Sequence, residues 1–94
     1  MMRYELATKY DARKSFGHKA IVEDDGTTKT LISYTTEVAK FSGNKLTLLP
    51  AWNSSPTTYR HVVEFAKQTG TYDQLLAAKK DTKIEHDNYD WKGM

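Results

Sequence analysis

The segment that most constrains the fold of this chain runs from Asn53 to Gly70 and predicts one long amphipathic helix. Its apolar residues recur three and four positions apart, which places them on one face of a helix. Ser55 followed by Pro56 is a typical helix start, and Gly70 is a typical left-handed helix stop. We therefore expect a core helix whose apolar stripe contains Tyr59, Val62, Val63, Phe65 and Ala66.

The charged residues of this helix predict a solvent-facing side. Arg60, Glu64 and Lys67 lie away from the stripe, and Arg60 and Glu64 have the i, i+4 spacing of a surface ion pair, which is worth only about 0.3 to 0.5 kcal/mol. His61 and Glu64 are three residues apart, a spacing that also suits proton transfer or one pair of metal ligands. Because a lone histidine beside an apolar face is usually a boundary residue, we expect His61 to be structural.

Two segments before the helix predict β-hairpins. Residues 19–23 and 29–34 flank an Asp-Gly turn signal, and residues 37–42 and 45–49 flank a Ser-Gly-Asn cluster. Residues 1–10 alternate only weakly and predict a short strand followed by a loop. Trp52, between sheet and helix, is expected to plug the edge of the core.

A second, shorter helix is expected at residues 72–80, where Thr71 and Gln74 have the spacing of a capping box. The predicted fold class is therefore α+β. It consists of an antiparallel sheet of two hairpins, about four strands in all, packed by the main C-terminal helix and the second short helix.

The chain length of 94 residues predicts a single small domain at 1–80, followed by a polar acidic tail at 81–94. Two Trp, six Tyr and three Phe argue for a folded chain with an aromatic core. The chain has no cysteine, which excludes disulfides and thiolate zinc sites. It also shows neither a run long enough to span a membrane nor an apolar signal-peptide core, so we expect a cytoplasmic protein without a membrane partner.

The net charge of +2 is small, but its distribution is uneven. The segment 13–19 interleaves cations with an aromatic ring, as surfaces that bind phosphates and bases do, although a solvated loop explains the pattern equally well. Glu85, His86, Asp87 and Asp90 have the residue types of a weak divalent-metal site, and a flexible acidic tail is the alternative.

Motifs for the common catalytic sites are missing from the sequence. It has no glycine-rich phosphate loop, no G-x-S-x-G elbow and no H-E-x-x-H helix. We therefore expect a protein that is not an enzyme and needs no cofactor.

Three ordered blocks resemble a family of small uncharacterised proteins of phages and mobile elements. Residues 14–20 (KSFGHKA), 33–39 (SYTTEVA) and 57–65 (TTYRHVVEF) are similar to the family patterns K-S-F-Y-G-K-A, S-Y-x-T-x-V-A and T-T-x-R-H-x-x-E-F. The chain departs from these patterns at Gly17 and His18, where the family tends to have Tyr-Gly.

This resemblance implies a non-catalytic, phage-associated accessory protein that binds a host protein. One form of such a protein is an anti-CRISPR-type inhibitor of a nucleic-acid-guided nuclease. The alternative, which follows from the basic segment itself, is a small DNA- or RNA-binding module. The residues expected to contact a partner are Arg13, Lys14, Phe16, His18, Lys19, Thr57, Thr58, Arg60 and His61.

Overall fold

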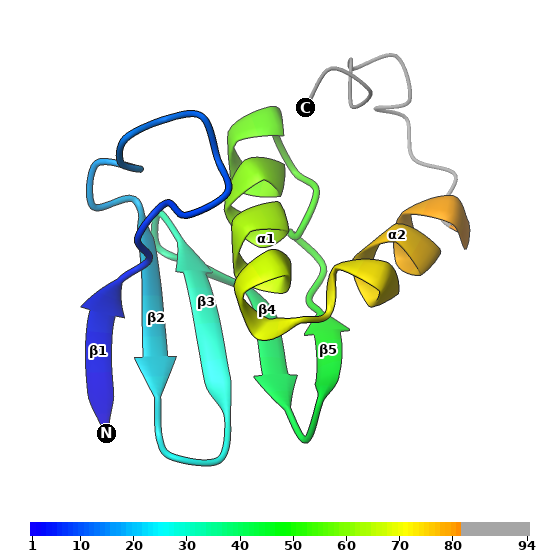
Figure 1. The fold of residues 1–94 in the computed structure, drawn as a ribbon, viewed down its shortest axis with the longest axis horizontal. Helices are drawn as coiled ribbons and strands as arrows, with labels where there is room; N and C mark the ends of the chain where they lie inside the picture. The colour runs from blue at the N-terminus through cyan, green and yellow to red at the C-terminus, as the bar shows by residue number, and fades with distance from the viewer. Residues whose placement is uncertain (82–94) are drawn as a thin grey trace.

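The computed structural model describes residues 1–81 as five antiparallel strands followed by two helices (Figure 1). The predicted α+β class is confirmed, and the sheet has one strand more than expected. The elements are β1 (Met2–Glu5), β2 (Ala20–Asp24), β3 (Lys29–Ser33), β4 (Thr36–Ser42), β5 (Lys45–Leu48), α1 (Pro56–Thr69) and α2 (Tyr72–Asp81).

The strands lie side by side in the order of the chain, from β1 to β5. The fifth strand is β1, the short strand expected within residues 1–10 but not counted in the predicted sheet, and it pairs with β2 from Met2 opposite Asp24 to Glu5 opposite Ile21. Its residues are largely exposed, so it lacks the alternation by which a half-buried strand is recognised in a sequence. The two expected hairpins are also joined directly, because β3 pairs with β4 through a two-residue turn.

Turn chemistry explains the two hairpins that the sequence predicted. The Asp25 carboxylate accepts the backbone N–H groups of Thr27 and Thr28 at 2.9 and 2.8 Å, which closes the turn between β2 and β3. Between β4 and β5, Gly43 and Asn44 have φ angles of 55° and 62°, as a two-residue primed turn requires.

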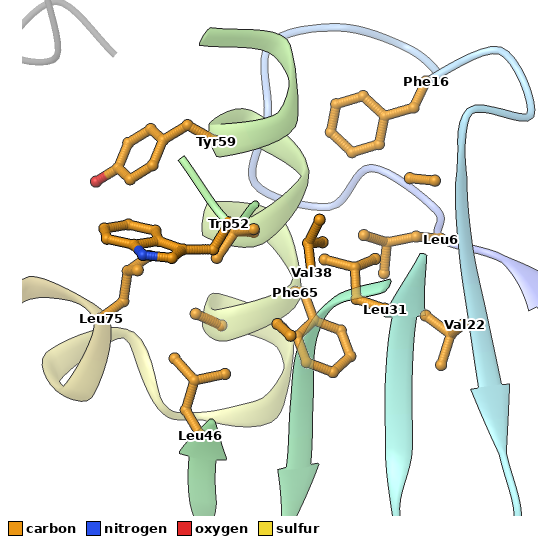
Figure 2. Packing of buried hydrophobic residues seen from close by; sticks show 14 residues of the cluster. Leu6, Phe16, Val22, Leu31, Val38, Leu46, Trp52, Tyr59, Phe65 and Leu75 are labelled. Atoms are coloured by element: carbon orange, nitrogen blue, oxygen red, sulfur yellow. The ribbon is translucent and has the colours of Figure 1, made fainter. Parts of the chain in front are cut away.

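The core lies between one face of the sheet and the two helices (Figure 2). Leu31 and Val22 from the sheet and Phe65 from α1 are almost completely buried. A register shift between β3 and β4 leaves Val38 as an extra residue opposite Leu31 and Ile32, and both Val38 and its neighbour Ala39 are buried. Figure 2 also shows that Trp52, Tyr59 and Leu75 extend this core, and Trp52 is 8% exposed, as its expected role as a plug requires.

The predicted signals at both ends of α1 are confirmed. The Ser55 hydroxyl accepts the backbone N–H of Thr58 at 3.1 Å, Pro56 occupies the first turn, and Gly70 closes the helix with φ of 74°. Of the expected stripe, all members except Val63 are buried. Val63 is half-buried at the edge of the core.

The capping box predicted for α2 is not formed. The Gln74 side chain instead accepts the backbone N–H of Leu46 at 2.8 Å and donates to the carbonyl of Asn44 at 2.8 Å. It therefore fastens α2 to the turn between β4 and β5. Within residues 1–81, neither helix is long and apolar enough to cross a membrane.

Candidate functional site

The long loop at residues 6–19 lies against α1 and is held there by a buried carboxylate (Figure 1). Glu64 is 1% exposed and accepts the backbone N–H groups of Lys9, Tyr10 and Asp11 at 3.1, 3.0 and 2.8 Å. Gln68, one turn later, donates both to Glu64 and to the carbonyl of Ala7. The prediction that Glu64 faces solvent and pairs with Arg60 is therefore wrong, because the loop supplies donors that satisfy and cover this carboxylate.

Arg60 pairs with the same loop rather than with its own helix. Its Nε and Nη2 groups donate to the two oxygens of Asp11 at 3.1 and 2.7 Å, which is a bidentate arrangement. The Asp11 carboxylate also accepts the backbone N–H of Arg13 at 2.8 Å. The hydrogen bonds from Arg60, together with that from Arg13, hold the pKa of Asp11 below its usual value despite partial burial.

A buried polar cluster joins the sheet to the first turns of α1. The Ser33 hydroxyl lies 2.8 Å from Nδ1 of His61 and 3.1 Å from the hydroxyl of Thr58. All three side chains are at most 5% exposed. The Phe16 ring closes the cluster on the loop side, edge-on to His61 with the ring centroids 4.5 Å apart.

His61 is held in its neutral form by this environment. Its pKa is lowered to about 4, chiefly by burial and also by the positive charges of Arg13, Lys19 and Arg60, against the opposing effect of Asp11. This geometry fits a structural role for His61, but the expected boundary position is wrong, because the side chain is only 1% exposed and its Nδ1 contacts the Ser33 hydroxyl. Within residues 1–81, no three His, Cys, Asp or Glu side chains gather closely enough to hold a metal ion.

A hollow of about 250 Å³ lies where the loop meets α1, and we call it the loop–helix pocket. The half-buried Val63 side chain and the exposed Tyr10 and Ala12 supply apolar surface. The charged groups beside them already have partners within the protein. Glu64 accepts backbone N–H groups of the loop, and Arg60 pairs with Asp11. The ammonium of Lys67 lies 4.9 Å from the centroid of the Tyr72 ring. The complete lining is Tyr10, Asp11, Ala12, Arg60, Val63, Glu64 and Lys67.

The structure divides the residues expected to contact a partner into two groups. Arg13, Lys14, His18 and Lys19 are exposed, and Thr57 is half-buried. Phe16, Thr58 and His61 are buried, and Arg60 is bonded to Asp11. Phe16 was expected to contact a partner and so to be exposed, and this is corrected, because its ring is only 5% exposed and packs on His61. The acidic cluster Glu85, His86, Asp87 and Asp90 lies outside the described residues.

Sequence reasoning missed Tyr34, the aromatic residue that is exposed beside the basic segment. Tyr34 is 50% exposed and forms the turn between β3 and β4, and Lys19 Nζ lies 5.8 Å from its ring centroid. The sequence places it in the strand at residues 29–34, where a tyrosine is common. The only sequence signal of a turn here is the short gap between the strands predicted at residues 29–34 and 37–42.

The three blocks that carry the family resemblance meet at the buried cluster. Phe16 belongs to the first block, Ser33 to the second, and Thr58 and His61 to the third. These blocks therefore specify how the loop, the turn after β3 and the start of α1 pack together. The exposed surface around them is the candidate binding region.

The fold and this region define an α+β protein with a five-stranded antiparallel sheet, two helices on one face and a long loop fastened to the first helix. The chain belongs to a family described as Family of unknown function (DUF8033), whose model matches residues 4–87. This match supports neither a phage origin nor an anti-CRISPR activity. No curated protein and no solved structure matches the chain.

Proposed function

We propose that this protein is a non-catalytic binding protein that takes a side chain of a protein partner into the loop–helix pocket. The observation that carries the proposal is that the charged groups of the pocket are engaged internally while its apolar walls are open. Glu64 is saturated by backbone donors, and Asp11 is paired with Arg60. A carboxylate whose oxygens already accept internal hydrogen bonds is poorly placed to act as a base or nucleophile.

The size of the pocket favours one partner side chain over a cofactor. Pockets for small molecules usually measure about 300 to 1,000 Å³, and this one holds about 250 Å³. Tyr10, 59% exposed, stands at its rim, and tyrosine and arginine are common anchors at protein interfaces. The resemblance to small phage and mobile-element proteins makes a host protein the first partner to test, and a nucleic-acid-guided nuclease belongs to that class.

Capture of a partner by the immobilised full-length chain tests the proposal when pocket variants are compared in parallel. Ala12→Trp fills the pocket from an exposed loop position, and Ala77→Trp makes the same change at an exposed position of α2, outside the pocket. We expect Ala12→Trp to weaken binding of the captured protein at least tenfold and Ala77→Trp to leave it unchanged. Equal binding by both variants, or no protein retained at micromolar concentration, overturns the proposal.

A further inference from the structure

The turn between β3 and β4 lies at the end of the molecule where the loop at 6–19 and the start of α1 also lie (Figure 1). Tyr34 is the first residue of this two-residue turn, and its backbone N–H donates to the carbonyl of Lys19 at 2.7 Å. One side of the ring approaches His61, with the centroids 6.0 Å apart. Half of the side chain remains open to solvent.

The backbone of Tyr34 has a conformation that tyrosine seldom adopts. Its φ angle is 59°, in the left-handed region that glycine and asparagine occupy easily. For another L-residue this conformation costs about 1 to 2 kcal/mol. The core does not require a half-exposed ring at this position. Strain retained at an exposed aromatic residue is typical of a binding site.

Lys19 lies beside this ring, and Arg13 and Lys14 belong to the same exposed basic segment of the loop. Within residues 1–81, Arg13, Lys14 and Lys19 form no ion pairs, and all three are exposed. Arg13 and Lys19 lie close enough to His61 to influence its protonation, and Lys19 lies beside the Tyr34 ring. His18 differs from them because it pairs with Glu5 at 2.7 Å. We call Arg13, Lys14, Lys19 and Tyr34 the basic end.

We propose that the basic end binds a single strand of nucleic acid, with one base stacked on Tyr34 and the flanking phosphates held by Arg13, Lys14 and Lys19. An exposed aromatic ring beside flexible cations is the combination that single-strand binding surfaces use. The bases of a duplex are already stacked on each other, so a duplex gains only from the cations. This inference does not depend on the loop–helix pocket or on a protein partner.

The small number of cations predicts weak and salt-sensitive binding. Three phosphate contacts to a single strand give a slope of log K against log salt of about −2, from roughly −0.7 for each contact. One stacked base adds about 1 to 3 kcal/mol, which corresponds to roughly fivefold to 150-fold in affinity. We therefore expect dissociation constants in the micromolar range at low salt.

Fluorescence anisotropy of labelled oligothymidylate and oligouridylate, titrated with the full-length chain, tests the inference. Tyr34→Phe keeps a ring for stacking and should bind like the original chain. Tyr34→Asn suits the left-handed backbone, so it should fold at least as stably while losing about fivefold or more in affinity. Lys19→Gln should weaken binding and make the slope of log K against log salt shallower by roughly 0.7, the value for one phosphate contact. Lys45→Gln, at the exposed first residue of β5, is the charge-matched control and should have no effect.

Three outcomes overturn the inference. The first is no change in anisotropy up to about 100 µM protein at low salt, the weak limit of non-specific binding. The second is Tyr34→Asn and Tyr34→Phe binding equally well, with duplex bound as tightly as single strand, which indicates charge attraction alone. The third is binding of polyglutamate but not of oligonucleotides, which assigns the basic end to an acidic protein partner.

Discussion

The carboxylate of Glu64 in α1 lies 2.8 Å from the backbone N–H of Asp11, a residue 53 positions earlier in the chain. This contact fastens the long loop to the helix and thereby shapes the loop–helix pocket. The carboxylate is buried and accepts several hydrogen bonds, so its removal leaves several backbone N–H groups without an acceptor.

Replacing Glu64 by alanine should lower the free energy of unfolding by about 3 kcal/mol, because several partly buried backbone donors of the loop lose one shared, charged acceptor. Urea denaturation measures this loss, and limited proteolysis should show earlier cleavage in the loop. Glu37→Ala, at an exposed position of β4, should change stability by less than about 0.5 kcal/mol. Similar midpoints for the two variants would contradict the assigned role of Glu64.

The free energy of unfolding should fall as the pH drops from about 6.5 to 4, because the fold keeps His61 neutral. The pKa of this histidine is about 4 in the fold and about 6.5 in the unfolded chain, so the unfolded chain takes up the proton first. The stability is fully present above pH 6.5, and the expected loss is about 3 kcal/mol by pH 4. Denaturation at a series of pH values measures the slope. His61→Gln should flatten it, and an NMR titration that placed the His61 pKa near 6.5 would refute the prediction.

The Asp11–Arg60 pair should show a coupling energy of about 1 kcal/mol in a double-mutant cycle with Asp11→Asn and Arg60→Gln. Arg60→Lys should recover little of it, because a lysine cannot reproduce the bidentate contact. The pKa of Asp11 is lowered in the fold, so its contribution is present above pH 3.8 and is lost as the pH falls through the lower folded value. A cycle that gives no coupling at pH 7 is the contrary result.

Replacing Gly70 by alanine should cost about 1 kcal/mol, because the residue closes α1 in the left-handed conformation. No atom lies within 4 Å of the position that a Cβ would take, so the cost comes from the backbone alone. Gly70→Asn should recover part of the loss, since asparagine tolerates this conformation. Thermal denaturation of the two variants compares these costs, and equal stability of Gly70→Ala and the original chain would disprove the argument.

Local signals in the sequence predicted the parts of the fold that neighbouring residues determine. Ser55, Pro56 and Gly70 indicated both ends of α1, and the Asp-Gly and Gly-Asn turns indicated two of the hairpins. β1 was weakly indicated, because an exposed edge strand has no apolar face to repeat.

The sequence could not predict contacts whose partners lie far along the chain. Glu64 has the spacing of a surface ion pair, and only the loop from residues 9–11 makes its burial possible. Gln74 matched a capping box, yet it bonds to Leu46 and Asn44 instead. The sequence predicted the candidate surfaces only in part. It indicated the cations of the basic end, but it pointed to Phe16 as the ring beside them, whereas the exposed ring is that of Tyr34.

The strand order also has a consequence for how the chain acquires its structure during synthesis. Each strand pairs with the one made just before it, so the sheet can grow step by step as the polypeptide emerges. The loop at 6–19 is different, because the acceptor that fastens it belongs to residue 64. This loop therefore stays unfastened until residue 64 has been synthesised, and until then its basic segment and Phe16 are exposed to chaperones and proteases.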